Sequence, residues 1–277
     1  MMDKYEYDAQ YVQNHYDAYG DQEWSRLVSN PEEEVKLHVH THYLRQHIKP
    51  GDAVLEIGAG AGRFTQVLAG IGAAVTVADI SPVQLELNRQ HALEHGFEAA
   101  VAKRIQLDMC DMHVLADEFD AVVCYGGPLS YVFDHAGEAL AEIRRVLRPG
   151  GVALFSVMSL WGAVHKMLNG ILTIPVEMNA GIIRSGDLTP QTYPPGKHFC
   201  RMYRAADLRR LLETHGLAVL EMSASNCVST HWNDRLAEIR NTPVHWNHLL
   251  ALELEACREP GGVDMGTHTI AITRRAR

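Results

Sequence analysis

Short apolar segments alternate with helix-like segments between residues 53 and 158, and this alternation constrains the fold more than any other feature of the chain. The apolar segments have the length of β-strands and lie at residues 53–57, 74–80, 101–107, 119–125 and 152–158. Helices are predicted between them at residues 63–69, 81–96 and 136–147. Strands that alternate with helices in this way form βαβ units, whose helices cover both faces of a parallel sheet. The pattern therefore predicts an α/β protein with a doubly wound, mostly parallel sheet.

The alternating region is flanked by segments with different patterns. Residues 1–48 are predicted to be helical, and one helix begins at Pro31, with Asn30 as its N-cap. Residues 160–203 are too long for a simple connection, so we expect a cap that binds the substrate. Alternation then resumes, with helices at 205–214 and 244–257 and strands at 217–223 and 267–273. The expected organisation is a helical cover (1–48), a cofactor-binding core (49–159), a substrate-cap insertion (160–203) and the remainder of the core sheet with a late helical insertion (204–277).

Composition places the chain among soluble globular proteins, because 47% of its residues are hydrophobic and 21% are charged. Its formal charge of −9 argues against a surface built to grip nucleic-acid phosphates. We find no apolar run long enough for a membrane-spanning helix and no secretory signal. The 5 cysteines are widely spaced, which favours a reducing compartment over a disulfide scaffold. We therefore expect a cytoplasmic protein with no nucleic-acid or membrane partner.

A glycine-rich turn follows the first predicted strand, in the segment VLEIGAGAGRF. Gly58, Gly60 and Gly62 allow a tight backbone turn and the close approach of a ligand to the amides that open the next helix. The dinucleotide-binding fingerprint would place its third glycine where this chain has Arg63. Because the acidic Glu56 precedes the turn, the site suits a ligand that carries positive charge.

Two further carboxylates follow the next two predicted strands. Asp79 ends the second strand, where a carboxylate can accept hydrogen bonds from both hydroxyls of a ribose. Asp108 follows the third strand, within reach of an adenine amino group. These positions predict a nucleoside-bearing ligand across the carboxyl ends of the strands.

These motifs together resemble the class I S-adenosylmethionine-dependent methyltransferases of the small-molecule type. The resemblance covers residues 53–158, including the turn at 147–151, and extends more loosely to the strand at 266–270. It implies that the glycine turn cradles the methionine moiety and that Glu56 supports its ammonium group. It also implies that Asp79 binds the ribose, that Ile80 stacks on the adenine, and that Asp108 and Met109 read the adenine edge.

The cofactor implied by the resemblance is S-adenosyl-L-methionine. The residues expected to contact it are Tyr19, Glu56, Gly58, Ala59, Gly60, Gly62, Asp79, Ile80, Asp108, Met109 and Tyr125. The implied architecture is a Rossmann-like methyltransferase fold, with a seven-stranded sheet whose last strand lies antiparallel between strands five and six.

The methyl acceptor is predicted to be a nitrogen or oxygen atom of a small metabolite. Residues 124–131 are expected to line the transfer pocket, and they lack the Asn-Pro-Pro-Tyr pattern of methyltransferases that act on nucleic-acid bases or glutamine. They also lack an aspartate at the end of the strand, which disfavours magnesium-dependent catechol chemistry. The predicted catalytic residues are Tyr131 and His198, the latter near the end of the cap insertion.

The 16 histidines raise the question of a metal site. His38 and His42 have the spacing of a metal-binding pair on a helix, but we find no motif that completes a site, so no metal is expected. No function is assigned to His91, His95, His135 and His215. Histidines that could reach the pocket from the cap or the late region are His165, His198, His231, His245 and His248.

Three other functions stay open at this stage. A nicotinamide-dependent oxidoreductase could share the fold, although Arg63 counts against it. Aminopropyl transfer from a decarboxylated cofactor is disfavoured because no paired aspartates follow the fourth strand. A non-catalytic protein could keep the cofactor pocket and act as an assembly partner. The sequence is also compatible with a homodimer and leaves the oligomeric state undetermined.

Overall fold

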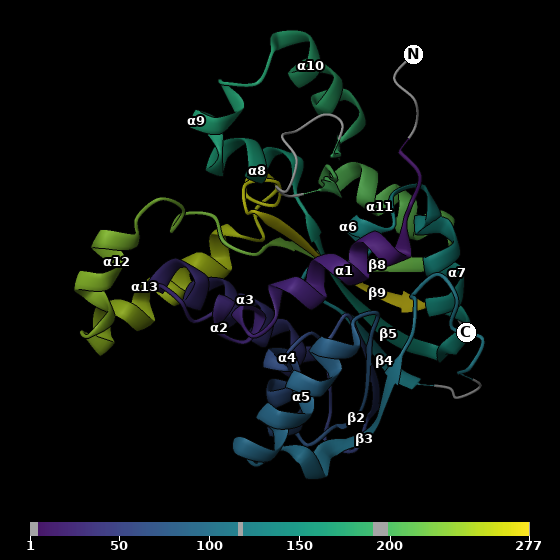
Figure 1. Ribbon diagram of the computed structural model, residues 1–277. Coiled ribbons are helices and arrows are strands. Elements are labelled where there is room, and N and C mark those ends of the chain that lie inside the picture. The colour runs from purple at the N-terminus through teal and green to yellow at the C-terminus, as the bar shows by residue number, and fades with distance from the viewer. Residues whose placement is uncertain (1–4, 116–118, 191–198, 277) are drawn as a thin grey trace.

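A seven-stranded sheet with the order β3-β2-β1-β4-β5-β9-β8 forms the centre of the protein (Figure 1). The computed structural model describes residues 5–115, 119–190 and 199–276. The strands of this sheet are β1 (Ala53–Ile57), β2 (Ala74–Asp79), β3 (Val101–Gln106), β4 (Phe119–Cys124), β5 (Leu147–Met158), β8 (Leu217–Ala224) and β9 (His268–Arg275). Strand β9 lies antiparallel between β5 and β8, and the pairs from β3 across to β5 are parallel. The predicted doubly wound α/β fold is confirmed.

The strand order reverses between β1 and β4. The chain adds β2 and β3 on one side of β1 and then returns to place β4 on the other side. At such a reversal the connections that leave the two neighbouring strands diverge, and they open a crevice at the carboxyl ends of the strands. This crevice is where the site predicted from the sequence should lie.

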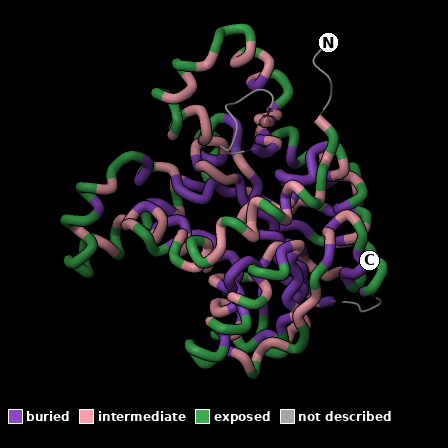
Figure 2. Tube along the Cα trace, viewed as in Figure 1, coloured by how far each residue is buried: buried purple, intermediate pink, exposed green. Residues whose placement is uncertain are grey.

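Helices cover both faces of the sheet, and the strands between them are buried (Figure 2). On one face, α3 (Pro31–His47), α4 (Arg63–Ile71) and α5 (Pro82–Glu94) contribute to a cluster with β1 and β2, and α13 (Pro243–Ala256) packs on α3. On the other face, α7 (Ala136–Val146) and α11 (Ala205–Thr214) form a second cluster. Two helix starts are as predicted, because the Asn30 side chain accepts from the Glu33 amide and the Ser81 side chain accepts from the Gln84 amide.

The structure corrects two details of the predicted elements. Strand β5 begins at Leu147, because the segment predicted as a turn continues the strand across a register shift opposite Phe119 and Ala121. A further helix, α12 (Asn233–Arg240), precedes α13. It buries only Leu236 among its residues, so it has no apolar stripe by which the sequence could reveal it.

The insertion after β5 folds into α8 (Leu160–Lys166), α9 (Leu168–Ile171), α10 (Val176–Ser185) and a small sheet of β6 (Asp187–Leu188) and β7 (Cys200–Arg201). A third apolar cluster joins this insertion to α1 (Ala9–Tyr19), with Val12, Leu160, Ile182 and Phe199 among its members. The insertion and the N-terminal segment therefore pack together beyond the carboxyl end of β5 (Figure 1). Among the described residues, no helix is long and apolar enough to cross a membrane.

Gly162 sets how closely the insertion approaches the sheet. A Cβ atom at Gly162 would lie 1.6 Å from the carbonyl oxygen of Gly266, just before β9. We predict that Gly162→Ala lowers the free energy of unfolding by about 1–3 kcal/mol, because the two backbones must move apart. Urea unfolding measures this change.

The matched control is Gly170→Ala in α9, where a Cβ atom would meet no other atom within 4 Å. This variant should be neutral or slightly stabilising, because alanine loses less backbone entropy than glycine in a helix. Equal destabilisation by the two substitutions would contradict the proposed close contact.

Candidate active site

A cavity of about 490 Å³ lies at the carboxyl edge of the sheet, where β1 and β4 meet. Its wall combines the turns after β1 to β4 with α1, α2 (Gln22–Arg26) and the start of α3. Of the residues predicted from the sequence, the cavity wall includes Tyr19, Gly58, Ala59, Gly60, Asp79, Ile80, Asp108, Met109, Tyr125 and Tyr131. Residues that are distant in sequence are therefore assembled around one space of a size that holds small ligands.

The turn after β1 is packed against the turn after β4. Gly58 has a φ of +65°, and a Cβ atom there would lie 2.3 Å from the ring of Pro128, the first residue of α6 (Pro128–Tyr131). A side chain at this position would be strained and would also clash. The amides of Gly58 and Ala59 donate to the carbonyl of Ala78 in β2, at 2.8 and 3.2 Å. These two amides therefore hold the turn to the sheet and are not free to bind a ligand.

Asp79 connects the turns after β1 and β2. One carboxylate oxygen accepts from the Gly60 amide and the other from the Ser81 amide, both at 2.8 Å. The side chain is buried and lines the cavity. Burial raises the pKa of Asp79 to about 6. The hydrogen bonds from the two backbone amides oppose this shift, because they favour the charged carboxylate.

Asp108 and Met109 line the neighbouring part of the cavity, beyond β3. The Cys110 amide donates to Asp108 at 2.9 Å and fixes the carboxylate at the strand end. Tyr7 approaches the same carboxylate from the N-terminal segment, and burial together with the Asp108 charge raises the pKa of its hydroxyl. Tyr7 was not predicted as a site residue, because nothing in its local sequence indicates which strand end it reaches.

Glu56 and Gly62 were predicted to contact the cofactor, but neither lines the cavity. The Glu56 carboxyl group accepts a hydrogen bond from the Thr65 hydroxyl at 2.6 Å. Burial raises the pKa of Glu56 to about 8, so the group is mostly protonated at neutral pH. Gly62 faces α5 instead, since a Cβ atom there would lie 2.8 Å from the side-chain nitrogen of Asn88. Both residues therefore support the turn on the side that faces away from the cavity, next to Thr65 and Asn88.

An ion pair on α2 lines the cavity above the glycine turn. The Arg26 guanidinium and the Glu23 carboxylate are 2.7 Å apart. A Cβ atom at Gly60 would lie 2.9 Å from Glu23, and one at Gly126 would lie 3.5 Å from Arg26. Burial opposes the charge of Arg26, but Glu23 outweighs it and raises the Arg26 pKa. The pair went unpredicted because only the tertiary structure brings α2 over the turns after β1 and β4.

Aromatic side chains form much of the wall near α6. Tyr131 is buried, and its ring centre lies 5.6 Å from that of Tyr16, whose hydroxyl donates to it. Burial raises the pKa of Tyr131 above its usual range, so its hydroxyl stays protonated at neutral pH. His15 lies beside Tyr16, with ring centres 5.2 Å apart, and lines the same space. Burial lowers the pKa of His15, which favours a neutral imidazole.

The other predicted histidines have different positions. His198 lies outside the described residues, and its catalytic role stays a prediction. His40, between the two spaced histidines of α3, is buried and bonds to the Lys36 carbonyl and the Ser156 hydroxyl at 2.7 and 2.9 Å. Burial lowers its pKa to about 4, so it is a neutral structural group. The described residues bring no third metal ligand to His38 and His42.

The far end of the cavity, near the start of α3, is polar but balanced in charge. The ammonium group of Lys36 lies 2.6 Å from Glu33, and that of Lys166 lies 2.6 Å from the buried Glu32. Lys36, Glu33 and Lys166 all line the cavity. Since each of these cations already has a carboxylate partner, this end does not attract an anion strongly.

This arrangement defines a class of enzyme. Carboxylates stand at the ends of β2 and β3, a compact glycine turn follows β1, and all lie at the reversal of strand order. A crevice at this place in a doubly wound sheet is where nucleoside-containing ligands bind in such folds.

Comparison with known proteins identifies the family. Residues 54–151 match the methyltransferase-domain family. A ubiquinone biosynthesis O-methyltransferase from Thiobacillus denitrificans is 33% identical over 174 residues, which cover 62% of this chain and 67% of the relative. The ubiquinone biosynthesis O-methyltransferase from Xanthomonas axonopodis pv. citri is 24% identical over 212 residues, which cover 75% of this chain and 80% of that protein.

Among solved structures, the [4+2]-cyclase SpnF has a similar fold. Its TM-score is 0.63 at 20% sequence identity, and the match covers 99% of this chain and 98% of the cyclase. The chain belongs to the class I S-adenosylmethionine-dependent methyltransferases. It is therefore an enzyme whose cofactor is S-adenosyl-L-methionine.

The raised pKa of Asp79 predicts a pH-dependent affinity for the product cofactor, S-adenosylhomocysteine. Asp79 is predicted to accept hydrogen bonds from the ribose hydroxyls, and its carboxylate gains a proton as the pH falls through about 6. We expect the dissociation constant at pH 5 to be about tenfold higher than at pH 7.5. Isothermal titration calorimetry at the two values measures it.

Asp79→Asn is the control for this prediction, because the amide keeps the shape of the side chain but does not titrate. It should bind weakly at both pH values and show no comparable change between them. A dissociation constant for the unmodified protein that is equal at pH 5 and pH 7.5 would disprove the role of the carboxylate.

Proposed function

We propose that this enzyme transfers the methyl group of S-adenosylmethionine to an oxygen atom of a small, uncharged aromatic metabolite. The observation that carries the proposal is the single cavity that joins Asp79 and Asp108 to a wall containing His15, Tyr16 and Tyr131. The curated relatives named above are O-methyltransferases, which supports oxygen as the acceptor atom.

The cofactor would lie across the strand ends with its nucleoside toward β2 and β3. Asp79 would accept from the ribose, Ile80 would pack on the adenine, and Asp108 with Met109 would face the adenine edge. The zwitterionic end of the methionine moiety matches the Glu23–Arg26 pair, because its ammonium can face Glu23 and its carboxylate can face Arg26. We assign the ammonium to Glu23 instead of Glu56, because Glu56 lies outside the cavity and is mostly protonated.

The acceptor would occupy the aromatic part of the cavity. Tyr16 and Tyr131 offer flat apolar surfaces, and Met158 lines the same region from the end of β5. The paired charges of Lys36 and Lys166 give no preference for an anionic acceptor. A neutral hydroxylated ring fits such a wall, because it can pack on the aromatic rings while its hydroxyl meets a polar side chain.

A protonated hydroxyl needs a base during transfer. The C–S bond of the sulfonium breaks as the C–O bond forms, S-adenosylhomocysteine leaves, and the hydroxyl proton goes to the base. His15 suits this role, because burial lowers its pKa and keeps the imidazole ready to accept a proton. Tyr131 does not suit it, because burial keeps its hydroxyl protonated. Tyr131 would instead orient the acceptor by hydrogen bonding.

Binding and transfer assays test the proposal together. We expect S-adenosylmethionine and S-adenosylhomocysteine, but not NAD, to raise the melting temperature. A panel of phenols, carboxylic acids and amines, incubated with labelled S-adenosylmethionine, should then yield label on the oxygen of a phenol. Label on amines alone would replace oxygen with nitrogen as the acceptor. Cofactor binding without transfer to any of these compounds would contradict the proposal and place the acceptor outside the three classes.

The role of His15 can be tested separately. We predict that His15→Gln lowers kcat by about 10²–10⁴-fold while the affinity for S-adenosylhomocysteine stays the same, because only proton transfer is lost. Steady-state kinetics on the phenolic substrate measure the change. His113→Gln, a substitution at an exposed histidine outside the cavity, is the matched control. If His15→Gln retains full kcat and His198→Gln does not, the base is the residue first predicted from the sequence.

A further inference from the structure

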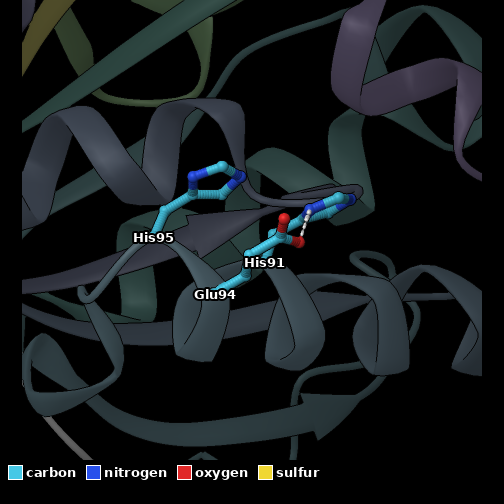
Figure 3. A group of neighbouring side chains, drawn as sticks. All are labelled: His91, Glu94 and His95. Atoms are coloured by element: carbon cyan, nitrogen blue, oxygen red, sulfur yellow. Dashed lines mark ion pairs between the residues drawn. The ribbon is translucent and has the colours of Figure 1, made fainter.

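Three potential metal ligands converge at the C-terminal end of α5, outside the cavity (Figure 3). One ligand atom from each of His91, Glu94 and His95 lies within 4.8 Å of the other two. The residues are spaced i, i+3 and i+4, so one face of the last helical turn presents all of them. The C-terminus of a helix carries a partial negative charge, which favours a cation at this position.

Asp21 sets the protonation pattern of His91. Its carboxylate lies 2.6 Å from Nε2 of His91, so that nitrogen carries the hydrogen and donates it. In the neutral ring, Nδ1 then holds a lone pair. Nδ1 is buried, and it has no hydrogen-bond partner among the described residues. A buried hydrogen-bond acceptor without a donor lowers stability. Its lone pair would be satisfied by a hydrogen-bond donor or by a metal cation that accepts the electron pair.

The Glu94 carboxylate cannot donate a hydrogen bond to Nδ1 of His91. A Glu94 carboxylate oxygen lies 3.9 Å away and is itself an acceptor. The His95 ring stacks on the same Trp24 indole as the His91 ring, and one of its nitrogens lies within 4.8 Å of the other two potential ligand atoms. A bound cation accounts for all three side chains.

We propose that Nδ1 of His91, the Glu94 carboxylate and the His95 imidazole bind one divalent transition-metal ion of the zinc type. Two imidazoles and a carboxylate are ligands that zinc accepts, whereas magnesium and calcium prefer oxygen ligands alone. Asp21 is the outer hydrogen-bond partner that orients a metal-bound histidine. Three protein ligands leave a position for water or a fourth group.

The three proposed ligands all lie at the end of α5, so the ion would act on α2 through the contacts that His91 and His95 make with that helix. The indole of Trp24 in α2 stacks on His91 and His95, with ring centres 4.1 and 4.9 Å apart, and Asp21 precedes the same helix. Glu23 and Arg26, which line the cavity, belong to α2 as well. We therefore assign the ion a structural role in keeping α2 over the cofactor cavity.

Metal titration of the untagged, chelator-treated protein tests the site. One equivalent of Zn²⁺ should bind, and Co²⁺ should give a visible spectrum without the strong near-ultraviolet band of thiolate ligation. His95→Gln and Glu94→Gln should each weaken binding at least tenfold, and Asp21→Asn should weaken it by about 10–100-fold. The matched control is His135→Gln, because His135 also pairs with a glutamate at i+3, at 2.6 Å, but belongs to no group of potential metal ligands among the described residues.

Hydrogen exchange provides an independent measurement. Zn²⁺ should slow exchange in residues 21–27 of the unmodified protein and have no such effect in His95→Gln. The proposal is overturned if no ion binds, if binding is undiminished in His95→Gln and Glu94→Gln, or if the Co²⁺ spectrum shows thiolate ligation.

Discussion

The carboxylate of Asp79 is the contact on which the site depends. By accepting from the amides of Gly60 and Ser81, it ties the turn after β1 to the turn after β2. The amides of Gly58 and Ala59 add two bonds to the same strand end. These hydrogen bonds hold the floor of the cavity to the sheet, and in the proposed binding mode the nucleoside lies on this floor.

The roof of the cavity comes from the N-terminal segment, and it is held by side chains of the core. The Gln84 amide group donates to the carbonyls of Tyr16 and Gly20, at 3.1 and 2.9 Å, and so anchors the end of α1 on α5. The Arg63 guanidinium lies 3.8 Å from the centre of the Trp24 ring and donates to the Trp24 carbonyl. Both anchors lie close to the crevice, so the methionine end of the cofactor would be enclosed by α1 and α2.

The histidines have different roles, and the surroundings of each side chain decide which role it has. His40 is a buried neutral group that bonds within the core, whereas His15 lines the cavity and is the proposed base. His91 and His95 belong to the outer surface of α5, where a carboxylate and an indole shape their environment. Spacing alone pointed to His38 and His42, but a helix also places such pairs on faces where no further ligand is near.

Local periodicity and the turns next to each strand are sufficient to predict the doubly wound fold and the strand ends that carry Gly58, Asp79 and Asp108. The sequence could not show that Glu56 and Gly62 lie below the turn, since this depends on the side chains of Thr65 and Asn88 against which they pack. Nor could it place His15, Glu23 and Arg26 in the cavity. Their position follows from the packing of α1 and α2 over strands that begin 27 or more residues later in the chain, and no local sequence pattern specifies contacts over such a distance.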